Sequence, residues 1–145
     1  MTRKETILVI CTHNACRSQM AEAYLRQMGG DAVDVMSAGL QPSDEIHELT
    51  VAVMNEVGLT LEGQHPSHIT DYLGKVPVTT VITVCDRAES DCPTTWPGAV
   101  ERLHWPFDDP ASYQTDDPAA QIEKFREVRE AIREKVAHWL SQTSS

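Results

Sequence analysis

The residues best suited to chemistry are a cysteine and an arginine six positions apart, within Cys11-Thr12-His13-Asn14-Ala15-Cys16-Arg17-Ser18. They follow an apolar run and precede a helical pattern. A loop in this setting can wrap its backbone N–H groups around a tetrahedral oxyanion, and the helix N-terminus adds positive potential. Arg17 would bind two oxyanion oxygens through its planar guanidinium, and the surroundings favour a thiolate at Cys11, the predicted nucleophile. The predicted oxyanion-binding residues are Thr12, His13, Asn14, Ala15, Cys16 and Arg17, with Asn14 and Ser18 bracing the loop through hydrogen bonds.

The same motif has a plainer interpretation as a buried cysteine at a strand end and a surface arginine on a helix. Its position between a strand and a helix favours the anion-binding loop instead. Cys16, inside the loop, is interpreted as packing against the backbone, with a protective disulfide to Cys11 as the alternative.

Alternating apolar segments predict the elements that position this loop. Thr6 to Ile10 is typical of a strand covered on both faces, and apolar residues from Met20 to Met28 recur at helical spacing until Gly29-Gly30. Further strands are predicted over 33–37, 78–84 and 100–105, and further helices over 46–57 with caps at 42–44, over 69–73, and from Asp117-Pro118 onward. The last helix carries an apolar stripe of Ile122, Phe125, Val128, Ile132, Val136 and Trp139.

This alternation predicts an α/β fold: a single domain over residues 1–145 with a four-stranded, mostly parallel sheet flanked by helices. Ligands of such folds bind at the carboxyl ends of the strands. Cys11, Cys85 and the Asp108-Asp109 loop all follow predicted strands, so we expect them at this edge.

Charge and composition narrow the function. The net charge of −10, from 22 acidic against 12 basic residues, argues against a nucleic-acid binder. The run Ile7 to Ile10 is too short for a signal peptide, and no stretch approaches the roughly 20 apolar residues of a membrane span, so we expect a cytoplasmic protein that binds no membrane. In a reducing compartment the four cysteines favour catalysis, redox chemistry, metal binding or burial over structural disulfides. The C-x4-C and C-x6-C spacings do not match structural zinc sites, and we predict no metal.

The motifs resemble the low-molecular-weight protein-tyrosine phosphatases and the arsenate reductases built on the same fold. The resemblance runs from Ile7 to the final helix and rests on CTHNACRSQMAE at 11–22, Ser37-Ala38-Gly39, VITVCDRAESDC at 81–92 and HWPFDDPA at 104–111. Gln19 is similar to the reductases, because the phosphatases usually carry Pro there. Ala111-Ser112 also stand where the phosphatases tend to place aromatic residues, with Tyr113 the only aromatic nearby.

Resemblance to the thioredoxin-coupled reductases implies arsenate as substrate and a disulfide cascade through Cys11, Cys85 and Cys92. It also implies Asp109 as general acid, with Asp108 as the second candidate. No cofactor would be bound, and thioredoxin would be the external reductant, with glutaredoxin, glutathione or mycothiol as alternatives. Taken alone, Cys85 could be a core residue and Cys92 a turn residue.

Two positions depart from the pattern of the family, and two other functions are compatible with the motifs. His13 stands where many members carry Gly, and residues 65–68 read His-Pro-Ser-His where some reductases hold potassium partly through Thr and Asp. A tyrosine phosphatase would need only Cys11, Arg17 and Asp109, and weak phosphatase side activity is compatible with the reductase. A thiol-based sensor would bind the oxyanion or arsenic without turnover.

Overall fold

The computed structural model describes residues 5–72, 74–85, 99 and 101–143. Its sheet contains β1 (Glu5–Cys11), β2 (Val33–Gly39), β3 (Thr80–Thr83) and β4 (Glu101–His104), all parallel, in the order β2-β1-β3-β4. The helices are α1 (Arg17–Gly29), α2 (Glu48–Glu56) and α3 (Pro118–Thr143), with short 3-10 turns η1 (Gly30–Ala32), η2 (Ile69–Asp71) and η3 (Pro110–Ser112). The predicted α/β class with a four-stranded parallel sheet is confirmed.

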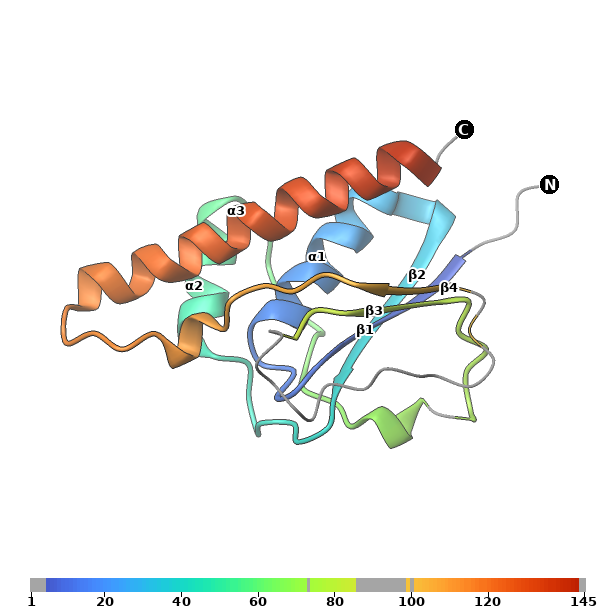
Figure 1. Ribbon diagram of the computed structural model, residues 1–145, viewed down its shortest axis with the longest axis horizontal. Helices are drawn as coiled ribbons and strands as arrows, with labels where there is room; N and C mark the ends of the chain where they lie inside the picture. Colours follow the sequence, from blue (N-terminus) through green and yellow to red (C-terminus); the bar gives the residue numbers. More distant parts are fainter. Residues whose placement is uncertain (1–4, 73, 86–98, 100, 144–145) are drawn as a thin grey trace.

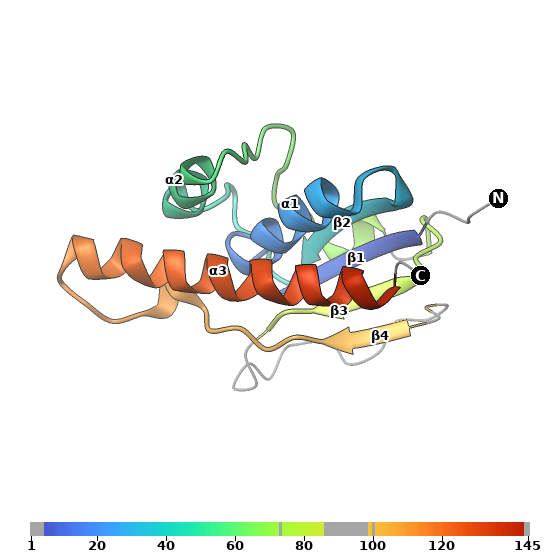
Figure 2. The ribbon, with the colours of Figure 1, turned by 90° about the horizontal axis from the view of Figure 1, so that it is seen from above.

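Strand β1 is interior because its side chains are apolar on both faces. Ile7 and Val9 pack into the larger core with α1 and α3, whereas Leu8 and Ile10 pack into a second cluster that includes Val78. Both helices lie on one side of the sheet, and the segment around η2 lies on the other (Figures 1 and 2). The continuous apolar run therefore predicted a strand buried on both faces correctly.

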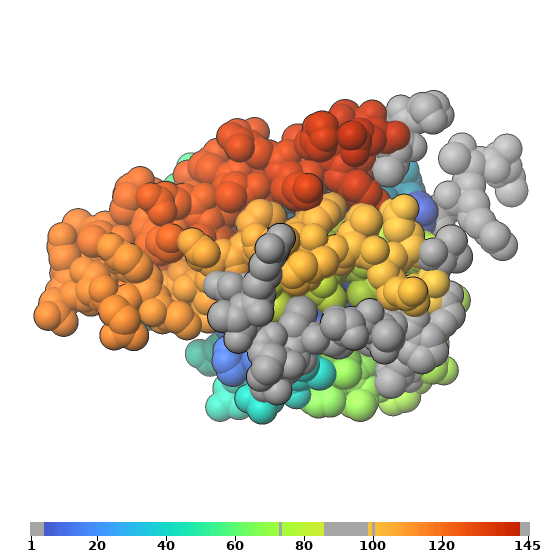
Figure 3. Space-filling model, in the orientation of Figure 1, coloured from blue at the N-terminus to red at the C-terminus, as the bar shows by residue number. Residues whose placement is uncertain are grey.

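Helix α3 buries one stripe against the sheet and α1. The buried residues, at helical spacing, are Phe125, Val128, Ile132, Val136 and Trp139, with Ile122 partly buried. Trp139 meets Trp105 edge to face at 5.8 Å between ring centroids, and α3 adjoins β4 on the surface (Figure 3). None of the helices within the described residues has the length and hydropathy that a bilayer crossing requires.

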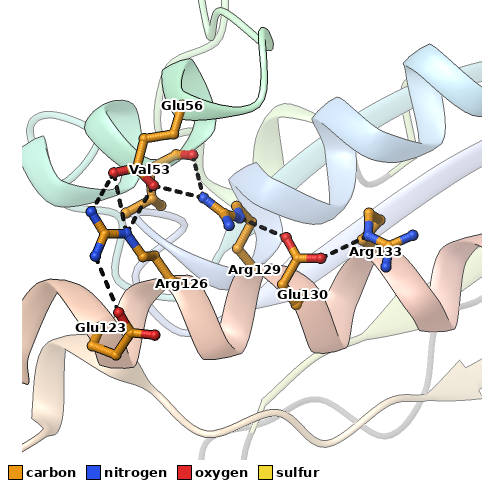
Figure 4. A network of polar contacts seen from close by, with 7 residues as sticks. All are labelled: Val53, Glu56, Glu123, Arg126, Arg129, Glu130 and Arg133. Carbon is orange, nitrogen blue, oxygen red and sulfur yellow. Dashed lines mark hydrogen bonds and ion pairs between the residues drawn. The ribbon is translucent and has the colours of Figure 1, made fainter.

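An ion-pair network joins the end of α2 to α3 (Figure 4). The Glu56 carboxylate accepts hydrogen bonds from Arg126 at 2.6 Å and from Arg129 at 2.8 Å. Arg129 also donates to the Val53 carbonyl at 2.9 Å, so it binds both the backbone and a side chain of α2. The hydrogen bonds from Arg126, followed by those from Arg129, lower the pKa of Glu56 to about 2.

The predicted start of α2 is wrong. The helix is capped by His47, whose Nδ1 accepts the Leu49 N–H at 3.1 Å, and not by residues 42–44. Backbone N–H groups of this segment instead donate to the loop after β1, from Ser43 to the His13 carbonyl and from His47 to the Ala15 carbonyl. These tertiary hydrogen bonds hold residues 41–47 in a non-helical path. Strands β3 and β4 are also shorter than predicted.

Candidate active site

The loop between β1 and α1 lies at the carboxyl edge of the sheet and opens into a small pocket. Its volume is about 100 Å³, well below the roughly 300–1,000 Å³ of pockets for drug-sized ligands. The pocket is lined by Cys11, His13, Ala15, Cys16, Arg17, Ser43, His47, Asp109 and Ala111. Of the predicted oxyanion-binding residues, His13, Ala15, Cys16 and Arg17 thus reach the pocket, whereas Thr12 and Asn14 are not among its lining residues.

The Cys11 sulfur is almost fully buried, with 2% of the residue exposed, and has two hydrogen-bond partners. The backbone N–H of Asn14 donates to Sγ at 3.1 Å, and the Ser18 hydroxyl lies 2.9 Å from it. Asn14 has φ 53°, in the left-handed region that asparagine tolerates better than most residues. The residue whose N–H contacts the sulfur thus has an unusual backbone conformation.

The side chain of Asn14 fixes the direction of the Ser18 hydrogen bond. Asn14 Nδ2 donates to Ser18 Oγ at 2.7 Å and to Ser37 Oγ at 2.9 Å, while its Oδ1 accepts the Ser67 N–H at 2.8 Å. Ser18 therefore accepts from Asn14, which leaves its single O–H to donate to Cys11. Two donors directed at one sulfur stabilise negative charge on it, as a thiolate nucleophile requires.

Arg17 closes one side of the pocket. Its side chain is only 3% exposed, donates to the Phe107 carbonyl at 3.2 Å, and lies 3.7 Å from the Asp109 carboxylate. The Phe107 contact orients the guanidinium from the loop after β4. A cation thus lies next to the nucleophile, where it can bind an anionic substrate.

The carboxylates of Asp109 and its neighbour Asp108 lie in different surroundings. Asp109 caps η3 by accepting from the Ala111 N–H at 3.0 Å and the Ser112 hydroxyl at 2.9 Å, and it lines the pocket. Asp108 is far more exposed and pairs with Lys124 at 3.0 Å, away from the pocket. Of the two carboxylates, only Asp109 lines the pocket that also holds Cys11.

Cys16 is a free, buried thiol in the core cluster that also holds Cys11. Burial raises the pKa of Cys16 to about 12, while the nearby Thr50 hydroxyl acts in the opposite direction. The thiol therefore stays protonated at neutral pH and is a poor nucleophile. Cys11 and Cys16 thus differ in environment although both lie in one loop.

Cys85 lies at the carboxyl end of β3, next to the end of β1. Ile10 pairs with Thr83, and the Val84 N–H donates to the Ile10 carbonyl at 2.9 Å. The Cys85 thiol lies 3.9 Å from the same carbonyl, and its side chain belongs to the buried cluster of Cys11 and Cys16. The fold thus brings Cys11 and Cys85 to neighbouring strand ends, whereas Cys92 lies outside the described residues.

Sequence reasoning missed two groups of residues around the site. Ser43 and His47 line the pocket, and the His47 ring lies 4.8 Å from that of Phe125. Ser37 and Glu22 join the polar network behind the loop; both stand in the motifs quoted above, which was the available signal. Among the described residues, no group of three or more His, Cys, Asp or Glu side chains could hold a metal ion.

The family is shown by sequence comparison. A model described as low molecular weight phosphotyrosine protein phosphatase matches residues 6–145. The chain belongs to the low molecular weight phosphotyrosine protein phosphatase family. The resemblance drawn from its motifs is therefore confirmed at the family level.

Within this family, the chain is similar to proteins named arsenate reductase. The protein of Brevibacillus brevis is 41% identical over 138 residues, spanning 90% of this chain and 100% of that protein. That of Bacillus cereus strain 03BB102 is 39% identical over 137 residues, with 94% of each chain covered.

Solved structures give the same grouping. An arsenate reductase in the phosphate binding state superposes with a TM-score of 0.77 at 29% identity, covering 97% of this chain and 99% of that chain. The thioredoxin-dependent arsenate reductase of Corynebacterium glutamicum gives a TM-score of 0.68 at 33% identity, covering 99% of this chain and 65% of the other. The fold of this chain is therefore similar to that of solved arsenate reductases.

Proposed function

We propose that this protein reduces arsenate to arsenite through a thiol–arsenic adduct on Cys11 and a disulfide cascade through Cys85 and Cys92. The proposal rests mainly on the position of two buried cysteines, Cys11 and Cys85, at the ends of adjacent strands. Cys11 also lines a small pocket together with Arg17 and Asp109. A phosphatase needs only the first cysteine. Similarity to proteins named arsenate reductase supports the same choice.

The first step takes place in the pocket. Arsenate binds against Arg17 and the loop of residues 12–17, and the Cys11 thiolate forms a bond to arsenic. One arsenic–oxygen bond breaks, and Asp109 supplies the proton that lets this oxygen leave as water. Arsenic keeps its oxidation state in this step.

The second step is the reduction. The Cys85 thiolate attacks the Cys11 sulfur, the sulfur–arsenic bond breaks, and its electron pair stays on arsenic, which leaves as arsenite. The two sulfurs lose two electrons and form a Cys11–Cys85 disulfide. Cys92 then attacks Cys85, so that Cys11 leaves as a thiolate and the disulfide passes to Cys85 and Cys92.

Turnover requires an external thiol donor. We propose thioredoxin, in keeping with the thioredoxin-dependent reductase of Corynebacterium glutamicum, and with it a reducing, cytoplasmic location. Glutaredoxin with glutathione, or mycothiol, would reduce a mixed disulfide instead and would make Cys92 dispensable. Whether turnover requires Cys92 therefore distinguishes thioredoxin from these other reductants.

Steady-state arsenite release separates the candidate functions. Wild-type protein with arsenate, thioredoxin, thioredoxin reductase and NADPH should release many arsenite molecules per chain. Cys11→Ser should release none, because arsenate reduction and phosphatase activity need the same Cys11 thiolate. A phosphatase would instead hydrolyse an aryl phosphate and form no arsenite. A sensor would bind without any turnover, and either result would reject the proposal.

A further inference from the structure

Arg26 lies on α1 outside the pocket, yet it anchors a polar network that ends at the nucleophile. Its side chain is half exposed and forms an ion pair with Glu22, one helical turn earlier. The guanidinium also donates to the Val35 carbonyl at 2.9 Å and to Gln64 Oε1 at 3.1 Å. An ion pair between residues four apart on a helix surface forms without contacts to other segments. The contacts with Val35 and Gln64 therefore set Arg26 apart from a simple surface pair.

One branch of the network runs from Arg26 through Glu22. The Glu22 carboxylate, almost fully buried, accepts from Ser37 Oγ at 2.6 Å. Because the Ser37 hydroxyl proton is used in this bond, Ser37 can only accept from Asn14 Nδ2, at 2.9 Å. This branch ends on the side-chain amide of Asn14.

A second branch runs from Arg26 through Gln64. The Oε1 of Gln64 accepts from Arg26, and its Nε2 donates to Gln19 Oε1 at 2.8 Å. Gln19 Nε2 then donates to the Asn14 backbone carbonyl at 2.9 Å. This branch ends on the main chain of Asn14.

The two branches meet at Asn14, on which both hydrogen bonds to the Cys11 sulfur depend. Asn14 presents its N–H to Cys11 and, by donating to Ser18, leaves the Ser18 hydroxyl to donate to Cys11. A guanidinium has donors only, so Arg26 at the outer end of the second branch fixes the orientation of the Gln64 and Gln19 amides. In the first branch the Glu22 carboxylate, which only accepts, directs the Ser37 hydroxyl, and Arg26 holds that carboxylate in place. Linked polar groups of this kind strengthen one another away from water.

We propose that Arg26 is a positioning residue for Cys11, holding Asn14 in its left-handed conformation through the Glu22–Ser37 and Gln64–Gln19 branches. Both hydrogen bonds to the Cys11 sulfur then depend on a guanidinium outside the pocket. The role concerns the reactivity of the thiol and holds for any oxyanion, so it stands separately from the proposed arsenate reduction.

The test is the pH dependence of Cys11 alkylation by iodoacetamide, followed by mass spectrometry of the Cys11 peptide. Arg26→Met should raise the midpoint by about 0.5 to 1 pH unit, because hydrogen bonds to a charged sulfur are weakened but not removed. Arg26→Lys should shift it less, since an ammonium keeps the charge but lacks the planar fork that serves both branches. The other titratable or charged groups around Cys11 stay unchanged: His13, Cys16, Arg17, His47 and Asp109.

Arg133→Met is the matched control. Arg133 is similarly exposed at 43% and pairs with an acidic residue of its own helix, Glu130, but it lies on α3 outside the network. Combining Arg26→Met with Glu22→Gln should shift the midpoint by less than the sum of the two single shifts, because Arg26→Met already breaks the branch that Glu22→Gln breaks.

Several results would overturn the proposal. An Arg26→Met profile that superimposes on wild type, or that shifts no more than Arg133→Met, would show that the guanidinium has no special role. Additive shifts in the double variant would mean that Arg26 does not act through Glu22. Alkylation of the buried Cys16 in step with Cys11 would indicate a loosened fold instead of a specific effect on the nucleophile.

Discussion

At the scale of single residues, chemical environment separates side chains of the same type. Asp108 and Asp109 are neighbours in the chain, yet one pairs with Lys124 at the surface and the other lies 3.7 Å from Arg17. The resemblance to the reductases implied Asp109 as the general acid, with Asp108 as the second candidate. Only the tertiary path of residues 104–112 shows which carboxylate faces the pocket.

Asp109→Asn should slow the first chemical step by about 10²- to 10⁴-fold, the usual contribution of a positioned general acid. Single-turnover kinetics under saturating arsenate measure this step apart from disulfide exchange. Asp108→Asn is the control and should leave the rate within about twofold of wild type, because surface changes of this kind have small effects. The reverse pattern would assign the proton transfer to Asp108.

At the scale of elements, the sequence predicted what depends on local pattern. The apolar run of β1, the stripe of α3 and the Asp117 cap all follow from periodicity and capping chemistry, and the Asp117 carboxylate accepts the Ala119 N–H at 3.0 Å. The start of α2 was missed because it is decided by hydrogen bonds to the loop after β1. Arg26 was missed for the same reason, since Gln64 and Val35 reach it only through the fold.

Gly39, at the end of β2, should tolerate no side chain. A Cβ there would lie 2.6 Å from the Thr12 carbonyl oxygen and 3.1 Å from the Asn14 nitrogen, so the backbone of the loop would have to move. Gly39→Ala should reduce the rate of Cys11 alkylation and destabilise the protein by about 1 to 3 kcal/mol, the usual cost of overpacking.

Gly29→Ala separates these two effects. Its Cβ would lie 2.5 Å from a methyl group of Val33, far from the loop. This variant should unfold at a lower denaturant concentration but keep the wild-type alkylation rate. If Gly39→Ala also kept that rate, the loop would not depend on the close approach of β2.

The ion pairs between α2 and α3 should make stability depend on acid pH. The pKa of Glu56 is lowered from 4.5 to about 2, so the folded state holds the ionised form more strongly than the unfolded chain does. This contribution is complete above pH 4.5 and is lost as the pH falls toward 2. Wild type should therefore have a higher melting temperature than Glu56→Gln at neutral pH, and the difference between the two melting temperatures should decrease as the pH falls through this range. A difference that stays constant from pH 6 to pH 2 would show that Glu56 acts through packing alone.

At the scale of the whole molecule, the parallel sheet gathers distant segments at one edge. The pocket is lined from the segments 11–17, 43–47 and 109–111, and Cys85 lies at the end of the neighbouring strand. The sequence could predict this gathering because the carboxyl ends of parallel strands share an edge. It could not supply the small size of the pocket or the two donors on Cys11, which depend on side-chain packing.

The central claim is that oxidation moves from Cys11 through Cys85 to Cys92, and Cys92→Ser tests it most directly. With excess arsenate and the complete thioredoxin system, this variant should release one arsenite per chain and stop. Peptide mapping should then find a Cys11–Cys85 disulfide, while slow hydrolysis of a small aryl phosphate by the reduced variant persists. Repeated turnover by Cys92→Ser with thioredoxin alone, or arsenite release without a Cys11–Cys85 disulfide, would contradict the cascade.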